Sequence, residues 1–408
     1  MSGVSSLLTS ASSALSLPLR SFLTGLSAAV LSCAPARPAA IASAPLPPRE
    51  ALDSLFTAYF DEGNTPGLAV GVVSRGGLVW SRSFGVRDLA TRAPVDEDTV
   101  FRVGSITKTF TGLAVLALRD QGKLALDAPA EQYLPELKGL VYPTDDSARI
   151  TLRNLVTHTS GLSRDGALPR LREGGHNPTE AELLASLEGQ RLDFAPGSSS
   201  AYSNQAAALT GLVVAHASGV PYADFVATAI LAPLGMTSTR YAIDPAWGAR
   251  LATGYRDTPA AAERWTPAEI TTPGPTQAGG HLWSTLRDLG RFVTFELGAW
   301  PPRSDADTGP VRRSTVRESQ LLAGDQRPDV PLHGVFWFVS KGDGRGTAAP
   351  TYIVSHDGEI DGFHAVIVFA PTSGVGVVAL ANGRDPARLE ATVLRALAVA
   401  LPLSPAPS

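Results

Sequence analysis

The chain has 408 residues, of which 44% are hydrophobic and 18% are charged, and its formal net charge is −4. This composition is typical of a globular protein with a large core, and it excludes the concentrated basic charge of a nucleic-acid-binding protein. A chain with one cysteine forms no internal disulfide, and no group of His, Cys or carboxylate residues has metal-ligand spacing. We therefore expect no metal, no cofactor and no nucleic-acid partner.

Residues 1–44 differ from the rest of the chain because they contain no acidic residue and are rich in Ser, Ala, Leu and Pro. Their apolar run from Phe22 to Ser32 is too short to span a membrane and is typical of a secretory signal. The run ends in a segment similar to a bacterial lipoprotein box, Val30-Leu31-Ser32-Cys33, which would place a lipid anchor on Cys33. Cleavage near Ala40-Ile41-Ala42 is the alternative and would remove that cysteine. Both interpretations predict an exported protein, in the periplasm, the cell envelope or the extracellular space.

Apolar runs bounded by turn residues predict strands at both ends of the remaining chain. A hairpin is expected near the start, with strands over Leu68–Val73 and Leu78–Ser81. The last third contains the other expected strands and a closing helix, at Val335–Val339, Tyr352–Ser355, Phe363–Ala370, Val375–Leu380 and, for the helix, Ala387–Leu401. Helices and loops occupy the middle of the chain.

This order of elements favours an α+β fold, in which an antiparallel sheet flanked by helices lies beside a mainly helical subdomain. After a leader and tether over 1–44, we expect one domain over 45–404. Its α/β part would comprise 45–125 and 285–404, and its helical part 126–284. The groove between the two parts is the expected place for a functional site.

A serine and a lysine lie three residues apart at the start of a predicted helix, in Ser105-Ile106-Thr107-Lys108. Apolar residues continue at helical spacing to Leu118, so the serine and lysine side chains share one face and can touch. A neutral lysine amine can take the proton of a serine hydroxyl, which then attacks carbonyl carbon. Only four of the 34 Lys and Arg residues are lysines, which favours a role for a titratable amine here.

Two later segments carry further candidate residues. Tyr202 and Asn204 precede a predicted helix over 205–216, and in an extended segment their side chains point the same way. The strand expected at Tyr352–Ser355 leads into His356-Asp357-Gly358-Glu359. Three distant segments thus each offer polar side chains to one site.

In order and spacing, these segments resemble the S-x-x-K, Tyr-x-Asn and Lys/His-x-Gly motifs of the serine β-lactamase and penicillin-binding protein superfamily. Secondary segments, among them Asp120–Asp127 and Ile150–Leu162, resemble its class C-like branch. That branch holds class C β-lactamases, D-alanyl-D-alanine carboxypeptidases, D-aminopeptidases and related esterases. The resemblance extends from about residue 50 to 400 and implies a β-lactamase/transpeptidase-like fold.

The resemblance implies catalytic roles for three residues. Ser105 would be the nucleophile that forms an acyl-enzyme, while Lys108 would hold its hydroxyl and share its proton. Tyr202 would act as general base in acylation and as acid toward the leaving group. Because a tyrosine hydroxyl has a reference pKa of about 10, the base role requires neighbouring groups that lower the pKa. Lys108 and His356 are the candidates for this effect.

Substrate binding is implied for four further residues. Asn204 would orient Lys108 and bind the substrate amide or ester, and His356 would face the site from the third motif. Gly358 precedes Glu359, whose backbone N–H would complete an oxyanion hole with the N–H of the nucleophile.

The third motif departs from the pattern of typical class A and class C β-lactamases, which carry Lys-Thr-Gly where this chain has His356-Asp357-Gly358. A histidine is mostly neutral at pH 7 and offers no fixed cation to the carboxylate of a β-lactam. We therefore expect a serine hydrolase that acts on small-molecule esters, D-amino-acid amides or peptides, as an esterase or D-alanyl-D-alanine carboxypeptidase does. A class C-type β-lactamase is the alternative. A non-catalytic penicillin-recognising or scaffold protein is the alternative of another class.

Overall fold

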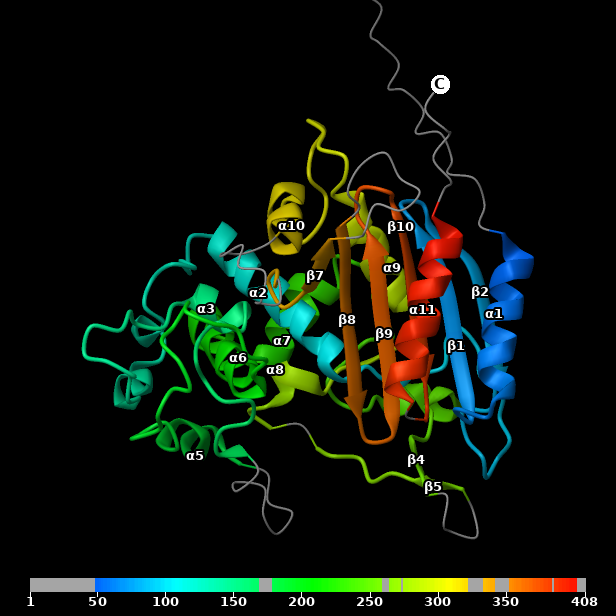
Figure 1. Cartoon of the computed structure of the whole chain (residues 1–408), viewed down its shortest axis with the longest axis horizontal. Helices are drawn as coiled ribbons and strands as arrows, with labels where there is room; N and C mark the ends of the chain where they lie inside the picture. Colours follow the sequence, from blue (N-terminus) through cyan, green and yellow to red (C-terminus); the bar gives the residue numbers. More distant parts are fainter. Residues whose placement is uncertain are drawn as a thin grey trace, which may run out of the picture. The chain divides into compact units, whose positions relative to one another are not determined.

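Strands from both ends of the chain form one antiparallel sheet in the order β2-β1-β10-β9-β8-β7 (Figure 1). The computed structural model describes residues 48–168, 178–258, 264–272, 274–321, 333–341, 352–383 and 385–401. The expected leader over 1–44, with Cys33, lies outside the described residues. The strands of the sheet are β1 (Gly67–Ser74), β2 (Gly77–Gly85), β7 (Phe338–Lys341), β8 (Tyr352–Ile360), β9 (Phe363–Ala370) and β10 (Val375–Ala381).

The central strands are apolar on both faces because helices cover both sides of the sheet. Every residue of β9 and of β10 is buried. Side chains alternate along β1, so Val70 joins one core and Val73 joins the core on the other face. Such strands have nearly continuous apolar sequences, which is why the sequence pattern locates them well.

Helices α1 (Arg49–Asp61) and α11 (Pro386–Ala400) cover one face of the sheet, and α9 (Leu286–Gly298) covers the other. In Figure 1, α11 crosses in front of the sheet and α9 lies behind it. The ring of Phe292 in α9 stacks on that of Phe110 in α2 (Thr107–Asp120), with the centroids 4.3 Å apart. The core behind the sheet therefore continues into α2.

Shorter elements form the rest of the described chain. Two small sheets pair β3 (Phe101–Arg102) with β6 (Trp283–Ser284) and β4 (Tyr255–Asp257) with β5 (Trp265–Pro267). The remaining described helices are η1 (Gly104–Ile106), η2 (Ala130–Gln132), η3 (Pro135–Gly139), α3 (Leu152–Val156), α5 (Glu180–Ala185), α6 (Asn204–Ser218), α7 (Tyr222–Val226), η5 (Ala227–Leu231), η6 (Pro245–Arg250), α8 (Gln277–Gly280) and α10 (Arg313–Gln320). Within the described residues, no single helix is long and apolar enough to cross a membrane. The α6 helix passes that test of length and composition only as a pair with α7–η5, bent by 76°.

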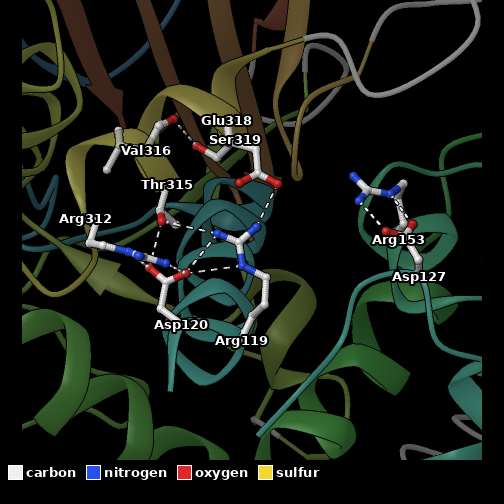
Figure 2. Close-up of polar contacts among 9 residues, drawn as sticks. All are labelled: Arg119, Asp120, Asp127, Arg153, Arg312, Thr315, Val316, Glu318 and Ser319. Atoms are coloured by element: carbon white, nitrogen blue, oxygen red, sulfur yellow. Dashed lines mark hydrogen bonds and ion pairs between the residues drawn. The ribbon is translucent and has the colours of Figure 1, made fainter. Parts of the chain in front are cut away.

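The C-terminal end of α2 is tied to α10 by a polar network around Asp120 (Figure 2). The Asp120 carboxylate accepts hydrogen bonds from Arg119 at 2.9 Å, Thr315 at 2.7 Å and Arg312 at 3.2 Å. Arg119 also donates to Glu318 at 2.7 Å. These contacts fix the end of α2 that lies away from its first turn.

The structure confirms the expected α+β fold, an antiparallel sheet flanked by helices. Strand β9 has the predicted bounds, and the predicted hairpin is the β1–β2 pair. The strand expected at Val335–Val339 is misplaced, because β7 begins at Phe338. Phe336 has a φ of +54°, in the left-handed region, so the chain is not extended there. Its N–H instead donates to the carbonyl of Val156 at 2.7 Å.

Candidate active site

Ser105 lies in the 3-10 turn η1, which leads directly into α2. Gly104 precedes it with a φ of +51°, a conformation that glycine adopts without strain. From the first turn of α2, Lys108 Nζ donates to Ser105 Oγ at 3.0 Å and to the carbonyl of Gly279 at 2.6 Å. The contact that the serine–lysine spacing predicts is therefore present.

Burial sets the protonation of Lys108, which is 0% exposed. Loss of solvent lowers its pKa from 10.5 to about 7, and the positive charge of Arg164 acts in the same direction. The carboxylates of Asp357 and Asp165 oppose the shift. Much of the amine is therefore neutral at pH 7 and able to accept the proton of Ser105.

Tyr202 lies between cationic and aromatic neighbours in the segment before α6. Its ring centroid is 4.9 Å from Lys108 Nζ and 5.0 Å from the guanidinium of Arg164, which are cation–π distances. The His158 ring lies 4.5 Å from the Tyr202 ring, and His158 Nδ1 accepts from the N–H of Ser203 at 3.1 Å. His158 thus braces the segment that carries the tyrosine.

The expectation that neighbouring groups depress the pKa of Tyr202 is wrong. Burial raises the pKa, and this effect outweighs the hydrogen bond with Ser105, which lowers it. The phenol is therefore protonated at pH 7 and suited to donate a proton. In this geometry Lys108, rather than Tyr202, is the group suited to act as the base.

Asn204 begins α6, and it lines the pocket at Ser105. Its amide nitrogen Nδ2 donates to Asp165 Oδ1 at 2.7 Å, and its backbone N–H donates to the carbonyl of Arg164 at 2.6 Å. In the structure the carbonyl of Gly279 therefore holds Lys108, in the place expected for Asn204. Sequence analysis missed Asp165 because no local pattern distinguishes this carboxylate from others on loops.

His356 enters the site from β8 and is neutral. The ring is almost fully buried, its Nδ1 donates to the carbonyl of Asp357 at 2.6 Å, and its centroid is 6.3 Å from that of Tyr202. Burial, and then the charge of Lys108, lowers its pKa to about 3. His356 therefore presents no cation at neutral pH and does not depress the pKa of Tyr202.

Two glycine-containing backbone segments meet beside the nucleophile. A Cβ placed on Gly358 would lie 2.0 Å from the carbonyl oxygen of Val103 and 2.7 Å from the nitrogen of Ser105. A Cβ placed on Gly104 would lie 2.5 Å from the nitrogen of Glu359. Only glycine permits this approach. The two expected oxyanion donors, the N–H groups of Ser105 and Glu359, thus belong to backbones in direct contact.

Substitution Gly358→Ala is expected to lower kcat by about 10²- to 10³-fold, because the added methyl forces apart the two segments that carry the donors. The measurement is steady-state hydrolysis of an activated ester. The matched control is Gly298→Ala, where an added Cβ meets nothing within 4 Å. An unchanged kcat in the Gly358→Ala protein would contradict this placement of the oxyanion hole.

A pocket of about 210 Å³ opens at Ser105. Its described lining includes Asp165, Asn204 and Glu359 of β8, and the side chain of Glu359 lies on the face of the sheet that carries His364. A second hollow of about 580 Å³ shares Glu359 and Ile360 with it and adds Arg256, Asp257 and Asp361. Charges of both signs lie near the nucleophile, because Arg164, 3.9 Å from Asp165, also approaches the ring of Tyr202.

Comparison with known proteins places the chain in a family. The sequence model of the Beta-lactamase family matches residues 52–401. Uncharacterized protein MT1414 of Mycobacterium tuberculosis is 32% identical over 290 residues, which are 66% of this chain and 70% of that protein. Protein flp of Staphylococcus aureus (strain MRSA252) is 24% identical over 342 residues, which are 82% of this chain. The chain spans 63% of the length of flp.

Solved structures share the fold. A class C beta lactamase from Rhodobacter sphaeroides is 25% identical with a TM-score of 0.69, over 86% of this chain and 98% of that protein. D-alanine carboxypeptidase AmpC from Burkholderia cenocepacia is also 25% identical, with a TM-score of 0.68 and the same coverage. Because the family match covers most of the chain and these folds agree, the chain belongs to the Beta-lactamase family.

Proposed function

We propose that this protein hydrolyses esters and D-amino-acid amides or peptides through an acyl-enzyme on Ser105. The observation that carries the proposal is the 3.0 Å contact between Ser105 Oγ and Lys108, an amine whose burial lowers its pKa to about 7. Such an amine activates a hydroxyl without a separate base. The protonated Tyr202 supplies the complementary acid.

In the proposed acylation, Lys108 acts as the base and Tyr202 acts as the acid. Neutral Lys108 accepts the proton of Ser105 Oγ as the oxygen attacks the substrate carbonyl carbon. The N–H groups of Ser105 and Glu359 hold the oxyanion that forms. Tyr202 then donates its proton to the leaving oxygen or nitrogen and regains one from Lys108. Deacylation repeats the sequence with water as the nucleophile.

The charge around the site supports substrates without a carboxylate. His356 is neutral at pH 7, and its Nδ1 already donates to the carbonyl of Asp357. Among the described residues that line the pocket, none is a lysine or an arginine. A β-lactam carboxylate would therefore find no cation in the third motif, whereas an uncharged ester would lose little.

Paired kinetics at pH 7 test this substrate class. We expect kcat/KM for p-nitrophenyl butyrate to exceed that for nitrocefin by at least about tenfold, a difference of about 1.4 kcal/mol in barrier. Substitution His356→Lys should narrow the gap by improving nitrocefin turnover, because a cation then faces the carboxylate. The control is His216→Lys, a change at an exposed histidine that should leave the ratio unchanged.

Two other outcomes of these kinetics would each identify one of the alternative functions. Faster nitrocefin turnover by the unmodified protein would identify a class C-type β-lactamase. Absence of turnover for esters, amides and nitrocefin, in a protein that still binds penicillin, would identify a non-catalytic penicillin-recognising protein.

A further inference from the structure

Three potential metal ligands meet on the face of the sheet that lies opposite His356. They are Asp357 of β8, His364 of β9 and Glu390 of α11, and one ligand atom of each lies within 4.8 Å of the others. His364 Nε2 is 4.0 Å from Glu390 Oε1. That distance is longer than a hydrogen bond. Small side-chain rotations would bring both atoms to about 2.0–2.2 Å from a shared cation.

Sheet register brings these residues together. Glu359 pairs with His364 in the β8–β9 ladder, so their side chains lie on the same face. Asp357 is two residues before Glu359 and shares that face as well. Glu390 comes from α11, which packs against the same face. No spacing in the sequence indicates this cluster, because its ligands come from three elements.

The surroundings of the cluster concentrate negative charge around an imidazole. His364 is 0% exposed, whereas the side chain of Glu390 is 44% exposed and offers a route from solvent. The carboxylates of Asp357 and Glu359 lie on the face against which α11 packs, so they gather like charge beside Glu390. A bound divalent cation would relieve the repulsion among these carboxylates.

We propose that Asp357, His364 and Glu390 bind one divalent transition-metal cation, with Zn²⁺ as the best match. One imidazole and two carboxylates, completed by water, are ligands that Zn²⁺ accepts in tetrahedral geometry. Mg²⁺ and Ca²⁺ prefer sites made of oxygen ligands alone. The cation would tie β8, which carries the oxyanion segment at Gly358, to α11. This site replaces the expectation of no metal.

Calorimetric titration of the tag-free, chelator-treated full-length protein with ZnCl₂ tests the site. We expect binding of one equivalent and a rise of the melting temperature. Asp357→Asn and Glu390→Gln should each weaken Zn²⁺ binding by at least about tenfold. Both changes preserve side-chain shape, and Glu390 is partly exposed, so the variants should fold. The control is Glu136→Gln at an exposed carboxylate outside the cluster, which should bind as the unmodified protein does.

A second arm separates this site from the active-site pocket. Protein whose Ser105 has been blocked by a fluorophosphonate should bind Zn²⁺ unchanged, because the cluster lies on the opposite face of the sheet. Loss of binding in the blocked protein would place the ion in the pocket and overturn the proposal. The proposal would also be overturned by absence of saturable binding, or by equal weakening in the Glu136→Gln control.

Discussion

Substitution Ser105→Ala is expected to abolish hydrolysis, with a loss in kcat of at least about 10⁴-fold. Alanine removes the Oγ that accepts the hydrogen bond of Lys108 at 3.0 Å. No nucleophile then remains beside the backbone segments of Gly104 and Gly358, which carry the two expected oxyanion donors. Covalent labelling by a fluorophosphonate or a fluorescent penicillin should disappear together with ester hydrolysis. The two readouts separate loss of the nucleophile from weaker substrate binding.

The control for this change is Ser304→Ala, at an exposed serine in the loop before α10. It should keep both full activity and labelling. Melting temperatures of both variants should stay close to that of the unmodified protein, because neither substitution opens a large cavity. Label that persists on the Ser105→Ala protein would show that another residue is the nucleophile.

Substitution Lys108→Arg is expected to lower kcat/KM for esters by about 10³-fold or more. Arginine keeps the positive charge but stays protonated in proteins, so it cannot take the proton of Ser105. Lys123→Arg is the matched control, since Lys123 is exposed just beyond the C-terminal end of the same helix. Activity close to that of the unmodified protein in Lys108→Arg would show that the amine is not the base.

The pH dependence of the unmodified enzyme tests the same role. Because burial lowers the pKa of Lys108 to about 7, the neutral base forms as the pH rises through that value. We therefore expect kcat/KM to fall about tenfold per unit below pH 7 and to level off above it. Tyr202, whose pKa is raised, and His356, whose pKa is about 3, do not titrate near pH 7. A profile that is flat from pH 5.5 to 8.5 would contradict the assignment.

A buried ion pair holds the two oxyanion segments in place. Arg102, three residues before Ser105, is 0% exposed and pairs with Asp361, two residues after Glu359. Asp361 also accepts from the N–H of Thr271 at 2.9 Å. Each backbone segment that meets at the nucleophile thus carries one partner of the pair. Removing one partner would leave an uncompensated buried charge, so the pair stabilises the site geometry only when intact.

The sequence by itself determined the local features of the site. Helix pitch brings residues three apart together, so the spacing of Ser105 and Lys108 was enough to predict their contact. Continuous apolar runs marked β9 and β10 because those strands are covered on both faces. The order of the three motifs also predicted the fold, because it resembles that of a family whose architecture is known.

Only the tertiary structure decided the properties that depend on packing between distant segments. Burial sets the two pKa values in opposite directions, since desolvation lowers the pKa of Lys108 and raises that of Tyr202. The carbonyl of Gly279 holds Lys108 from a segment far along the chain. The cluster at His364 likewise arises from strand register and helix docking. Sequence spacing describes neighbours along a helix or strand, whereas solvent exclusion and long-range contacts exist only once the elements have packed.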